Sequence, residues 1–171
     1  TRDILHVSGI LGKKDSVDFM VNHWTSKYGD VVSSASKRLY QSGKLCHIID
    51  SLTKVRDIPF IIAMGDFNEN EDDPAMKKLT DDCSVRFPAY RYTDPAVEGT
   101  YKYRGRWERI DHFLISGAED VYRVTGSVFS IPPLLEPDEG YTGLKPARTY
   151  TGYSYQGGVS DHLPVILDIT R

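Results

Sequence analysis

The order of apolar and polar positions along the chain predicts a mixed α/β protein. Residues 4–11 and 18–22 show the partial alternation of strands, and residues 12–16 between them have the composition of a hairpin turn. Residues 27–36 are polar and predict a loop. Residues 37–54 then predict a helix, because apolar side chains recur there at i, i+3, i+4 and i+7. These side chains are Leu45, Ile48, Ile49 and Leu52.

The middle of the chain predicts a buried strand followed by a short helix. Residues 59–64 are a nearly continuous apolar run, which is typical of a strand covered on both faces. Asp73 and Pro74 have the residue types of an N-cap and a first helical position, and they predict a helix over residues 75–79.

The rest of the chain alternates between strands and turn-rich segments. Further strands are predicted at residues 109–116, 122–131 and 163–169. Residues 84–107 and 132–158 are rich in turn residues and tyrosines, and we interpret these tyrosines as packing residues rather than as a binding platform. Strands joined mainly by hairpins, with one long and one short helix, favour a layered α/β fold over strict βαβ alternation.

Composition is that of one ordinary globular domain. The chain has 171 residues, of which 40% are hydrophobic and 26% are charged. No apolar run approaches the roughly 20 residues of a membrane-spanning helix, and no signal peptide is visible. The chain begins at Thr1 rather than Met, so we expect the natural start to lie upstream. The cysteines predict neither a metal site nor a disulfide: Cys46 is interpreted as a core thiol on a helix, and Cys83 is left open.

The net charge of −3 gives no overall attraction to nucleic acid, whose binding is largely electrostatic. Nucleic acid is therefore an open but unfavoured partner. Two segments, Lys37-Arg38 and Tyr101-Lys102-Tyr103-Arg104, are candidates for a local basic patch with interleaved aromatic rings.

Polar side chains gather where the apolar runs end or begin. They are Asn22, His23, Asp66, Asn68, Asp111, Asp161 and His162. Carboxylates and carboxamides without cysteine suit Mg²⁺, Mn²⁺ or Ca²⁺, and histidines beside carboxylates suit proton transfer and phosphate binding. Structural alternatives stay open, since each cluster alone is compatible with a turn or an ion-paired core residue. His6 and His47 are interpreted as a strand residue and a helix-face residue.

The pair Asp66 and Asn68 carries the most specific chemistry. Residues two apart on an extended segment face the same way, so the carboxylate is expected to activate water while the carboxamide fixes the substrate or the water. This favours metal-assisted hydrolysis of a phosphate ester over acyl transfer. The chain has no serine or cysteine nucleophile elbow, phosphate-binding loop or dinucleotide fingerprint.

Three motifs, in this order, resemble the endonuclease/exonuclease/phosphatase superfamily, which includes deoxyribonuclease I, abasic-site endonucleases, neutral sphingomyelinases and inositol-polyphosphate phosphatases. They are Gly65-Asp66-Phe67-Asn68-Glu69, Ile110-Asp111-His112 and Ser160-Asp161-His162-Leu163-Pro164-Val165. Asn22-His23-Trp24-Thr25-Ser26 resembles the motif that precedes them. The amino-acid sequence of these motifs and of Gly99-Thr100-Tyr101-Lys102-Tyr103 is most similar to that of uncharacterised bacterial members of Bacteroidetes type.

The resemblance implies a four-layered α/β sandwich of deoxyribonuclease I type, with its site at one edge of two packed sheets. Family members are longer than this chain, and the motifs match their C-terminal part. Residues 1–171 are therefore expected to be the C-terminal portion of one such domain, incomplete at its N-terminal side.

The resemblance also implies roles for the polar residues on the phosphate side of the site. Asp66 would orient or deprotonate the attacking water, and Asn68 would contact the phosphate. His23 would stabilise phosphate charge, and Asn22 would help to bind the substrate.

For the remaining motif residues, the resemblance implies roles in acid–base chemistry and in metal binding. His162 would be the imidazole nearest the scissile phosphate, with Asp111 orienting it, and Asp161 would belong to a Mg²⁺ or Mn²⁺ site. That metal site normally also needs a Glu, and usually an Asn, from strands nearer the N-terminus, and neither has a match here.

The expected function is therefore divalent-metal-dependent hydrolysis of a phosphate ester, by water attack at phosphorus. Whether the enzyme would be a phosphodiesterase, a nuclease or a phosphatase stays open. The alternatives are a non-catalytic binding or interaction module on the same scaffold, and an inactive fragment. The resemblance also implies an uncovered strand edge near residues 4–11, or an uncovered sheet face behind it, through which the chain is expected to self-associate or to dock with the rest of its own protein. It further points to secretion or the periplasm.

Overall fold

The structure is a computed structural model that describes residues 2–12, 15–27, 29–57 and 59–171. Within the predicted turn at 12–16, residues 13 and 14 lie outside these ranges. The chain divides into two compact units. Unit 1 consists of Thr1–Pro88, Asp111–Arg123 and Ile169–Arg171, and unit 2 of Ala89–Ile110 and Val124–Asp168. Each unit is described by itself.

The elements of unit 1 are β1 (Leu5–Leu11), β2 (Asp15–His23), α1 (Val31–Val55), β3 (Ile61–Asp66), α2 (Pro74–Asp82) and β7 (Asp111–Ser116). The strands form one mixed sheet in the order β1-β2-β3-β7. β1 pairs antiparallel with β2, as the predicted hairpin requires, and β3 pairs antiparallel with β7. β2 and β3 are parallel, because α1 returns the chain between them.

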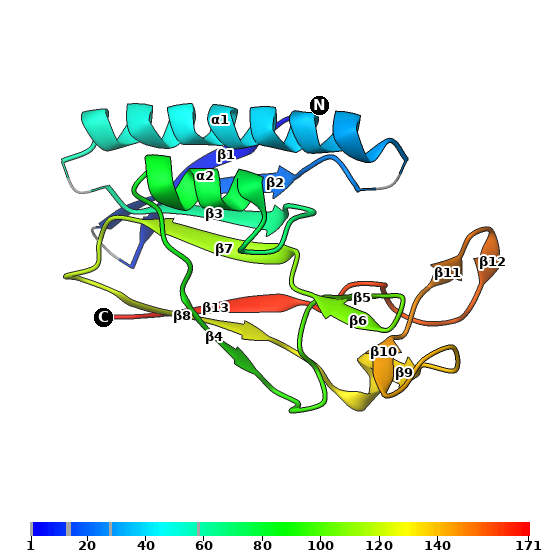
Figure 1. The fold of residues 1–171 in the computed structure, drawn as a ribbon. Coiled ribbons are helices and arrows are strands. Elements are labelled where there is room, and N and C mark those ends of the chain that lie inside the picture. The colour runs from blue at the N-terminus through cyan, green and yellow to red at the C-terminus, as the bar shows by residue number, and fades with distance from the viewer. Residues whose placement is uncertain (1, 13–14, 28, 58) are drawn as a thin grey trace. The chain divides into compact units, whose positions relative to one another are not determined.

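Both helices of unit 1 lie on the same face of its sheet (Figure 1). The core between helices and sheet is apolar. It includes Leu45 and Ile49 from α1, Leu79 from α2, and Met20 and Leu114 from the strands. Leu45 and Ile49 belong to the apolar stripe that the sequence predicts, so burial of that stripe confirms the helical period.

The long helix begins earlier than predicted, and the loop prediction for residues 27–36 is wrong from residue 31 onward. Asp30 is the N-cap, and its side chain accepts a hydrogen bond from Val32 N at 3.1 Å. The side chains that the first helical turns bury are polar, Ser34 and Arg38, so these turns carry no apolar stripe that would reveal the helix in the sequence. The capping residue was the available signal.

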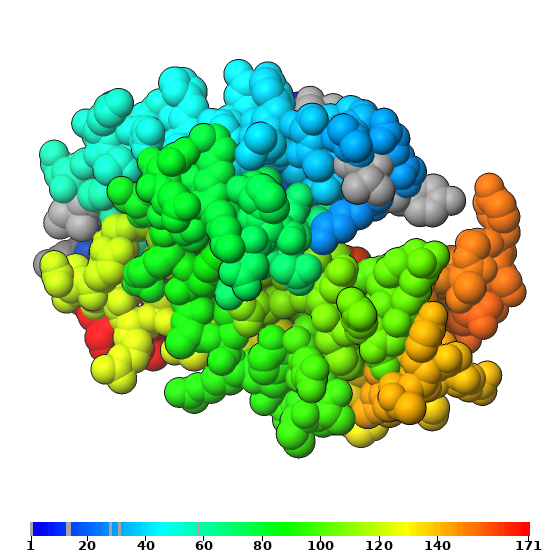
Figure 2. All heavy atoms as spheres, viewed as in Figure 1, coloured from blue at the N-terminus to red at the C-terminus, as the bar shows by residue number. Residues whose placement is uncertain are grey.

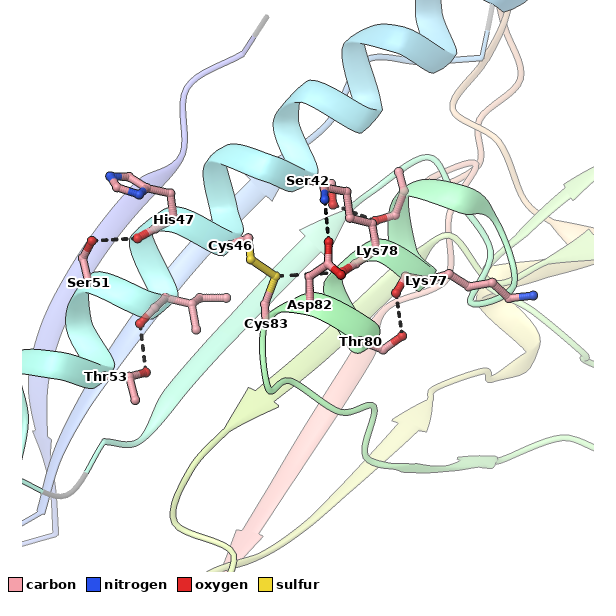
Figure 3. The surroundings of a disulfide bond; sticks show 12 residues. Ser42, Cys46, His47, Ser51, Thr53, Lys77, Lys78, Thr80, Asp82 and Cys83 are labelled. Atoms are coloured by element: carbon pink, nitrogen blue, oxygen red, sulfur yellow. Dashed lines mark hydrogen bonds and ion pairs between the residues drawn. A yellow bond between two sulfur atoms is a disulfide. The ribbon is translucent and has the colours of Figure 1, made fainter.

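The cysteines form a disulfide, so the expectation of a core thiol without a partner is wrong. Cys46 on α1 and Cys83 at the end of α2 are bridged, with their Cα atoms 5.4 Å apart (Figure 3). Cys83 is buried in the core of unit 1. The two residues are 37 positions apart, and only packing of α2 against α1 brings them together.

A buried carboxylate on β2, Asp18, joins this strand to β1 and to the residue that follows α1. Asp18 Oδ2 accepts a hydrogen bond from Arg56 Nε at 3.0 Å, and Oδ1 accepts from Arg56 NH2 at 2.9 Å and from Ser8 Oγ at 2.5 Å. His6 Nε2 lies 2.9 Å from Asp18 Oδ1, which agrees with a structural role for this histidine. His47 is exposed on α1, as interpreted.

Unit 2 consists of strands and hairpins. Its elements are β4 (Ala89–Tyr92), β5 (Tyr101–Tyr103), β6 (Arg106–Glu108), β8 (Arg123–Val128), the 3₁₀ turn η1 (Pro132–Leu134), β9 (Leu135–Pro137), β10 (Leu144–Pro146), β11 (Tyr150–Thr151), β12 (Ser154–Tyr155) and β13 (Val165–Thr170). β13, β8 and β4 form one sheet in that order, with β4 parallel to β8. β5–β6, β9–β10 and β11–β12 are antiparallel pairs. The predicted strands at 122–131 and 163–169 are thus present with shifted ends.

The tyrosines of unit 2 include a partly buried and an exposed group. Tyr90 and Tyr92 pack against its small core, as expected. Tyr150, Tyr153 and Tyr155 are exposed, contrary to the packing interpretation. They belong to the β11–β12 hairpin, which is orange in Figure 2. The rings of Tyr150 and Tyr155, which are direct partners across the hairpin, lie 5.4 Å apart and contact each other while they stay exposed.

Neither proposed basic patch forms as expected. Lys102 is buried, pairs with Asp138 at 3.2 Å and donates to the carbonyl of Thr142 at 2.8 Å. Arg38 is also buried, on α1. Each patch therefore loses a cation that the sequence offered for nucleic-acid binding.

Candidate functional site

Strand register in unit 1 aligns three candidate residues at one end of the sheet. His23 at the end of β2 is the direct partner of Asp66 at the end of β3, and Asp66 is the direct partner of Asp111 at the start of β7. Direct partners on neighbouring strands project to the same face. His23 Nε2 lies 3.4 Å from Asp66 Oδ2. Residues 43 and 45 positions apart in the sequence thus become neighbours through strand pairing alone.

A glycine makes this close strand pairing possible. Gly65 has a φ of +129°, a conformation that side chains rarely adopt. A Cβ atom at this position would lie 2.0 Å from the backbone oxygen of Asn22 on β2. Any substitution would therefore push β3 away from β2 at the position just before Asp66.

Asn22 supports the site from behind instead of facing it. Its side chain is buried, donates to Met20 O at 2.8 Å and accepts from Trp24 Nε1 at 3.1 Å. The expected substrate contact by Asn22 does not fit this placement. Consecutive strand residues alternate faces, so the exposure of His23 sends Asn22 into the protein.

Asn68 fixes both oxygens of the Asp66 carboxylate. Asn68 N donates to Asp66 Oδ1 at 2.8 Å, and Asn68 Nδ2 donates to Asp66 Oδ2 at 3.0 Å. Asn68 has a φ of 52°, so the chain turns here rather than staying extended. The two side chains do act together, but through a turn in which the carboxylate bonds the backbone two residues on. Nδ2 also donates to Trp24 O at 3.2 Å, which ties the turn to the segment after His23.

The two carboxylates at this edge suit a cationic ligand. Asp66 and Asp111 are direct partners on adjacent strands, where two like charges repel unless a cation or proton lies nearby. His23, 58% exposed at its side chain, places an imidazole 3.4 Å from the Asp66 carboxylate. Such a group of carboxylates with an imidazole can orient a water molecule and exchange its proton.

The same residues do not by themselves complete a metal site. Across the ranges that the structure describes, no group of three or more His, Cys, Asp or Glu side chains is arranged to hold a metal ion. Mg²⁺ sites use oxygen ligands, and Asp66 and Asp111 offer the right atoms but too few of them. The carboxylates of unit 1 therefore offer oxygen ligands of the kind that divalent cations prefer, without forming a complete site among the residues described.

The residues behind the site include a buried ion pair that the sequence did not reveal. Arg38 on α1 donates through Nε to Glu69, and both side chains are buried. Burial raises the pKa of the Glu69 carboxyl, which the hydrogen bond from Arg38 opposes. Glu69 O accepts a hydrogen bond from His112 Nε2 at 2.8 Å, so this imidazole carries its proton on Nε2. The sequence did contain a signal for the burial of Arg38: it lies seven residues before Leu45, about two helical turns, and so falls on the buried face of the helix.

Asp161 and His162 belong to unit 2 and precede β13. Asp161 is exposed, and His162 N donates to Ser160 Oγ at 3.1 Å. The ring of His162 lies 4.9 Å from the ring of Tyr101, and the residues form an isolated β-bridge. Leu163 N also donates to Thr100 O at 2.7 Å. The segment Gly99–Tyr103, singled out in the sequence, thus holds the backbone around His162.

Comparison with known proteins identifies the family. The model of the endonuclease/exonuclease/phosphatase family matches residues 1–171, and the chain belongs to this family. A search of curated protein sequences gives no match. The motifs around Asp66, Asp111 and His162 are the ones on which the resemblance rested.

Solved structures share the fold at low sequence identity. Sphingomyelinase C from Streptomyces griseocarneus is 18% identical, with a TM-score of 0.64 over 96% of this chain and 56% of that one. A beta toxin mutant from Staphylococcus aureus with bound magnesium ions is 16% identical, with a TM-score of 0.64 over 94% and 55%. A mannosyl-6-phosphatase from Bacteroides thetaiotaomicron is 17% identical, with a TM-score of 0.56 over 91% and 51%.

These likenesses establish the fold class. The chain has the α/β fold of deoxyribonuclease I type, and its sandwich is incomplete. It spans about half the length of the structures that it matches. No helix in the described ranges has the length and apolar character needed to cross a membrane.

Proposed function

We propose that this protein hydrolyses a phosphate ester by attack of water at phosphorus, with a divalent cation, Mg²⁺ or Mn²⁺, as cofactor. The observation that carries the proposal is the row of His23, Asp66 and Asp111 across β2, β3 and β7, with both Asp66 oxygens held by Asn68. Family membership supports hydrolysis of a phosphate ester in general. The magnesium-bound beta toxin supports the choice of cofactor.

In this proposal Asp66 orients the attacking water and accepts its proton. A carboxylate with both oxygens fixed loses little freedom when it aligns a water molecule, which is the advantage of a preorganised base. Asn68 bonds Asp66 and Trp24 through its side-chain nitrogen, Nδ2. Its carboxamide oxygen is the atom proposed to contact the substrate. His23 stabilises phosphate charge. Asn22 is assigned a supporting role in place of substrate binding.

We also propose roles for the residues of the two later motifs, Asp111, Asp161 and His162. His162 serves as the imidazole that acts on the scissile phosphate, and Asp161 serves as a metal ligand beside further oxygen ligands. Asp111 supplies a carboxylate that orients an imidazole. When bound, the cation would supply charge stabilisation at the phosphate oxygens.

We further propose that residues 1–171 form the C-terminal portion of one such domain. The chain covers about half of each related structure, which supports the view that it is part of a larger domain. Secretion or a periplasmic location is proposed as well, because the Cys46–Cys83 disulfide persists in oxidising compartments and not in a reducing cytosol.

The test is hydrolysis by the full-length protein of a para-nitrophenyl diester and of the matching monoester, with Mg²⁺, Mn²⁺ or a chelator. Asp66→Asn and His162→Ala should each lower turnover by about 10² or more. His47→Ala is the matched control, since this exposed α1 histidine touches none of the site residues described above. Near-normal turnover in either site variant would exclude that residue from the mechanism. Activity that persists in the presence of the chelator would exclude a catalytic role for the cation.

A non-catalytic interaction module is the second candidate. The observation in its favour is the absence, among the residues that the structure describes, of a group able to hold a metal alone. Full-length protein that binds a phosphate ester without turning it over, at any of the tested metal conditions, would favour this candidate.

A further inference from the structure

The first half of α1 carries a buried polar face that its role as a core helix does not require. Ser34, Arg38, Gln41 and Ser42 are buried, although core-facing helix positions are usually apolar. The same stripe continues as Leu45 and Ile49 toward the C-terminal half of the helix. Buried polar side chains need partners to offset their desolvation, so the partners show what this face does.

The partners on one side belong to the segment that follows His23. Thr25 is held through both of its backbone groups. Its N–H donates to Gln41 Oε1 at 3.0 Å, and its carbonyl accepts from Arg38 NH1 at 3.2 Å. The preceding residue, Trp24, donates its N–H to Asp66 O at 2.8 Å. This face of α1 therefore fixes the chain two residues beyond His23.

The partner on the other side belongs to the loop that follows Asp66. The same guanidinium that bonds Thr25 O also donates to the Glu69 carboxylate. The Glu69 carbonyl accepts from His112, the neighbour of Asp111 on β7. Through Glu69, Arg38 is connected to the loop of Asp66 and Asn68 and to the strand of Asp111.

The outer ends of the two loops are joined independently. Lys27 Nζ lies 3.0 Å from Asp73 Oδ2, and Asn70 N donates to the same oxygen at 2.8 Å. Burial would raise the pKa of Asp73, but the polar surroundings of its carboxyl, which include the Glu69 carboxyl, the Asn70 N–H and the Lys27 ammonium, outweigh burial and lower that pKa. The Lys27 pair is about one-third exposed, so the buried Arg38 contact is the stronger constraint.

We propose that Arg38 is a positioning residue for the candidate site: its guanidinium joins the segment after His23 to the loop after Asp66, and so fixes these two side chains against each other. The meaning of this role for catalysis rests on the proposed function. Arginine suits the task because its planar guanidinium carries several donors in fixed directions and bonds two acceptors at once. Lysine offers a single ammonium on a flexible stem.

A structural ion pair and a positioning pair respond differently to apolar replacement. Exchanging both members of a buried ion pair for apolar side chains of similar volume is often neutral for stability. The double variant Arg38→Met/Glu69→Met should therefore stay folded while it loses the directional bonds to Thr25. Arg38→Lys is the conservative variant, and Lys78→Met/Asp82→Met is the control, since it removes an exposed ion pair of α2.

The experiment measures three quantities for each variant of the full-length protein: cooperative unfolding in urea, kcat and KM for a para-nitrophenyl phosphodiester, and backbone amide exchange of Trp24 and Thr25 by NMR. In the double variant we expect cooperative unfolding, kcat lower by about a hundredfold with KM within about twofold, and amide exchange at least about tenfold faster. Arg38→Lys should lie between wild type and the double variant, and the control should match wild type.

The outcomes separate this proposal from the proposed function. If a folded double variant keeps wild-type kcat and amide exchange, Arg38 has no positioning role. If wild-type protein hydrolyses no phosphate ester, the proposed function fails, and the exchange rates alone decide whether Arg38 joins the two segments. Should the double variant not fold, Arg38→Lys decides: wild-type exchange and kcat in that variant would overturn the proposal.

Discussion

Removal of the Cys46–Cys83 disulfide should lower the stability of this protein by an amount that the structure allows us to calculate. The bridge closes a loop between residues 37 positions apart. The chain-entropy relation gives a loss of about 4 kcal/mol at 25 °C for a loop of that size. The whole stability of a typical domain is about 5–15 kcal/mol, so this loss is a large part of it. In thermal unfolding it corresponds to a midpoint lower by roughly 8–16 °C.

The assay is equilibrium urea unfolding of wild type and of Cys46→Ala/Cys83→Ala, followed by tryptophan fluorescence. Trp24 is a suitable probe because it is buried in the core of unit 1, with its ring 4.9 Å from that of Phe67. Reductant should lower the stability of wild type to about that of the double variant and leave the variant unchanged. The single variant Cys46→Ala separates packing from cross-linking, since Cys83 then stays in the core. The reasoning would be refuted if the double variant lost less than about 1 kcal/mol of unfolding free energy, or if reductant did not change the unfolding free energy of wild type.

Three further predictions concern pH, metal and association. Burial alone would raise the pKa of Asp18, but hydrogen bonds from Arg56, Ser8 and His6 lower it from 3.8 to about 2. Because the unfolded state takes up this proton first, stabilisation of up to about 2 kcal/mol is present above pH 3.8 and lost as the pH falls to about 2. The stability difference between wild type and Asp18→Asn should shrink over that interval, and a constant difference in acid titrations would contradict the assignment. Calorimetric titration of residues 1–171 with Mg²⁺ should show weak or no binding, and tight binding would show that the chain supplies a full set of ligands. Sedimentation across a wide concentration range should show self-association that Val7→Lys weakens, since β1 is an edge strand in the described sheet and its Val7 is 47% exposed; a strict monomer would exclude this contact.

Local sequence determined the elements and the motifs. The apolar run ending at Gly65 predicted β3 and put Asp66 at its end, and the helical spacing from Leu45 to Leu52 predicted most of α1. These features depend on a few neighbouring residues, and hydrophobic periodicity reports them directly. The motifs also pointed to the family, which the match over residues 1–171 confirms.

Tertiary structure decided which residues meet. Strand register set His23 and Asp111 on either side of Asp66, and helix packing brought Cys46 to Cys83. The sequence suggested that Arg38 belongs to a basic patch, because a charged residue type does not show by itself that it is buried. In the structure Arg38 is buried, and its pairing with Glu69 offsets the desolvation of its charge. Such contacts depend on the pairing of segments far apart in the chain, for which no local pattern exists.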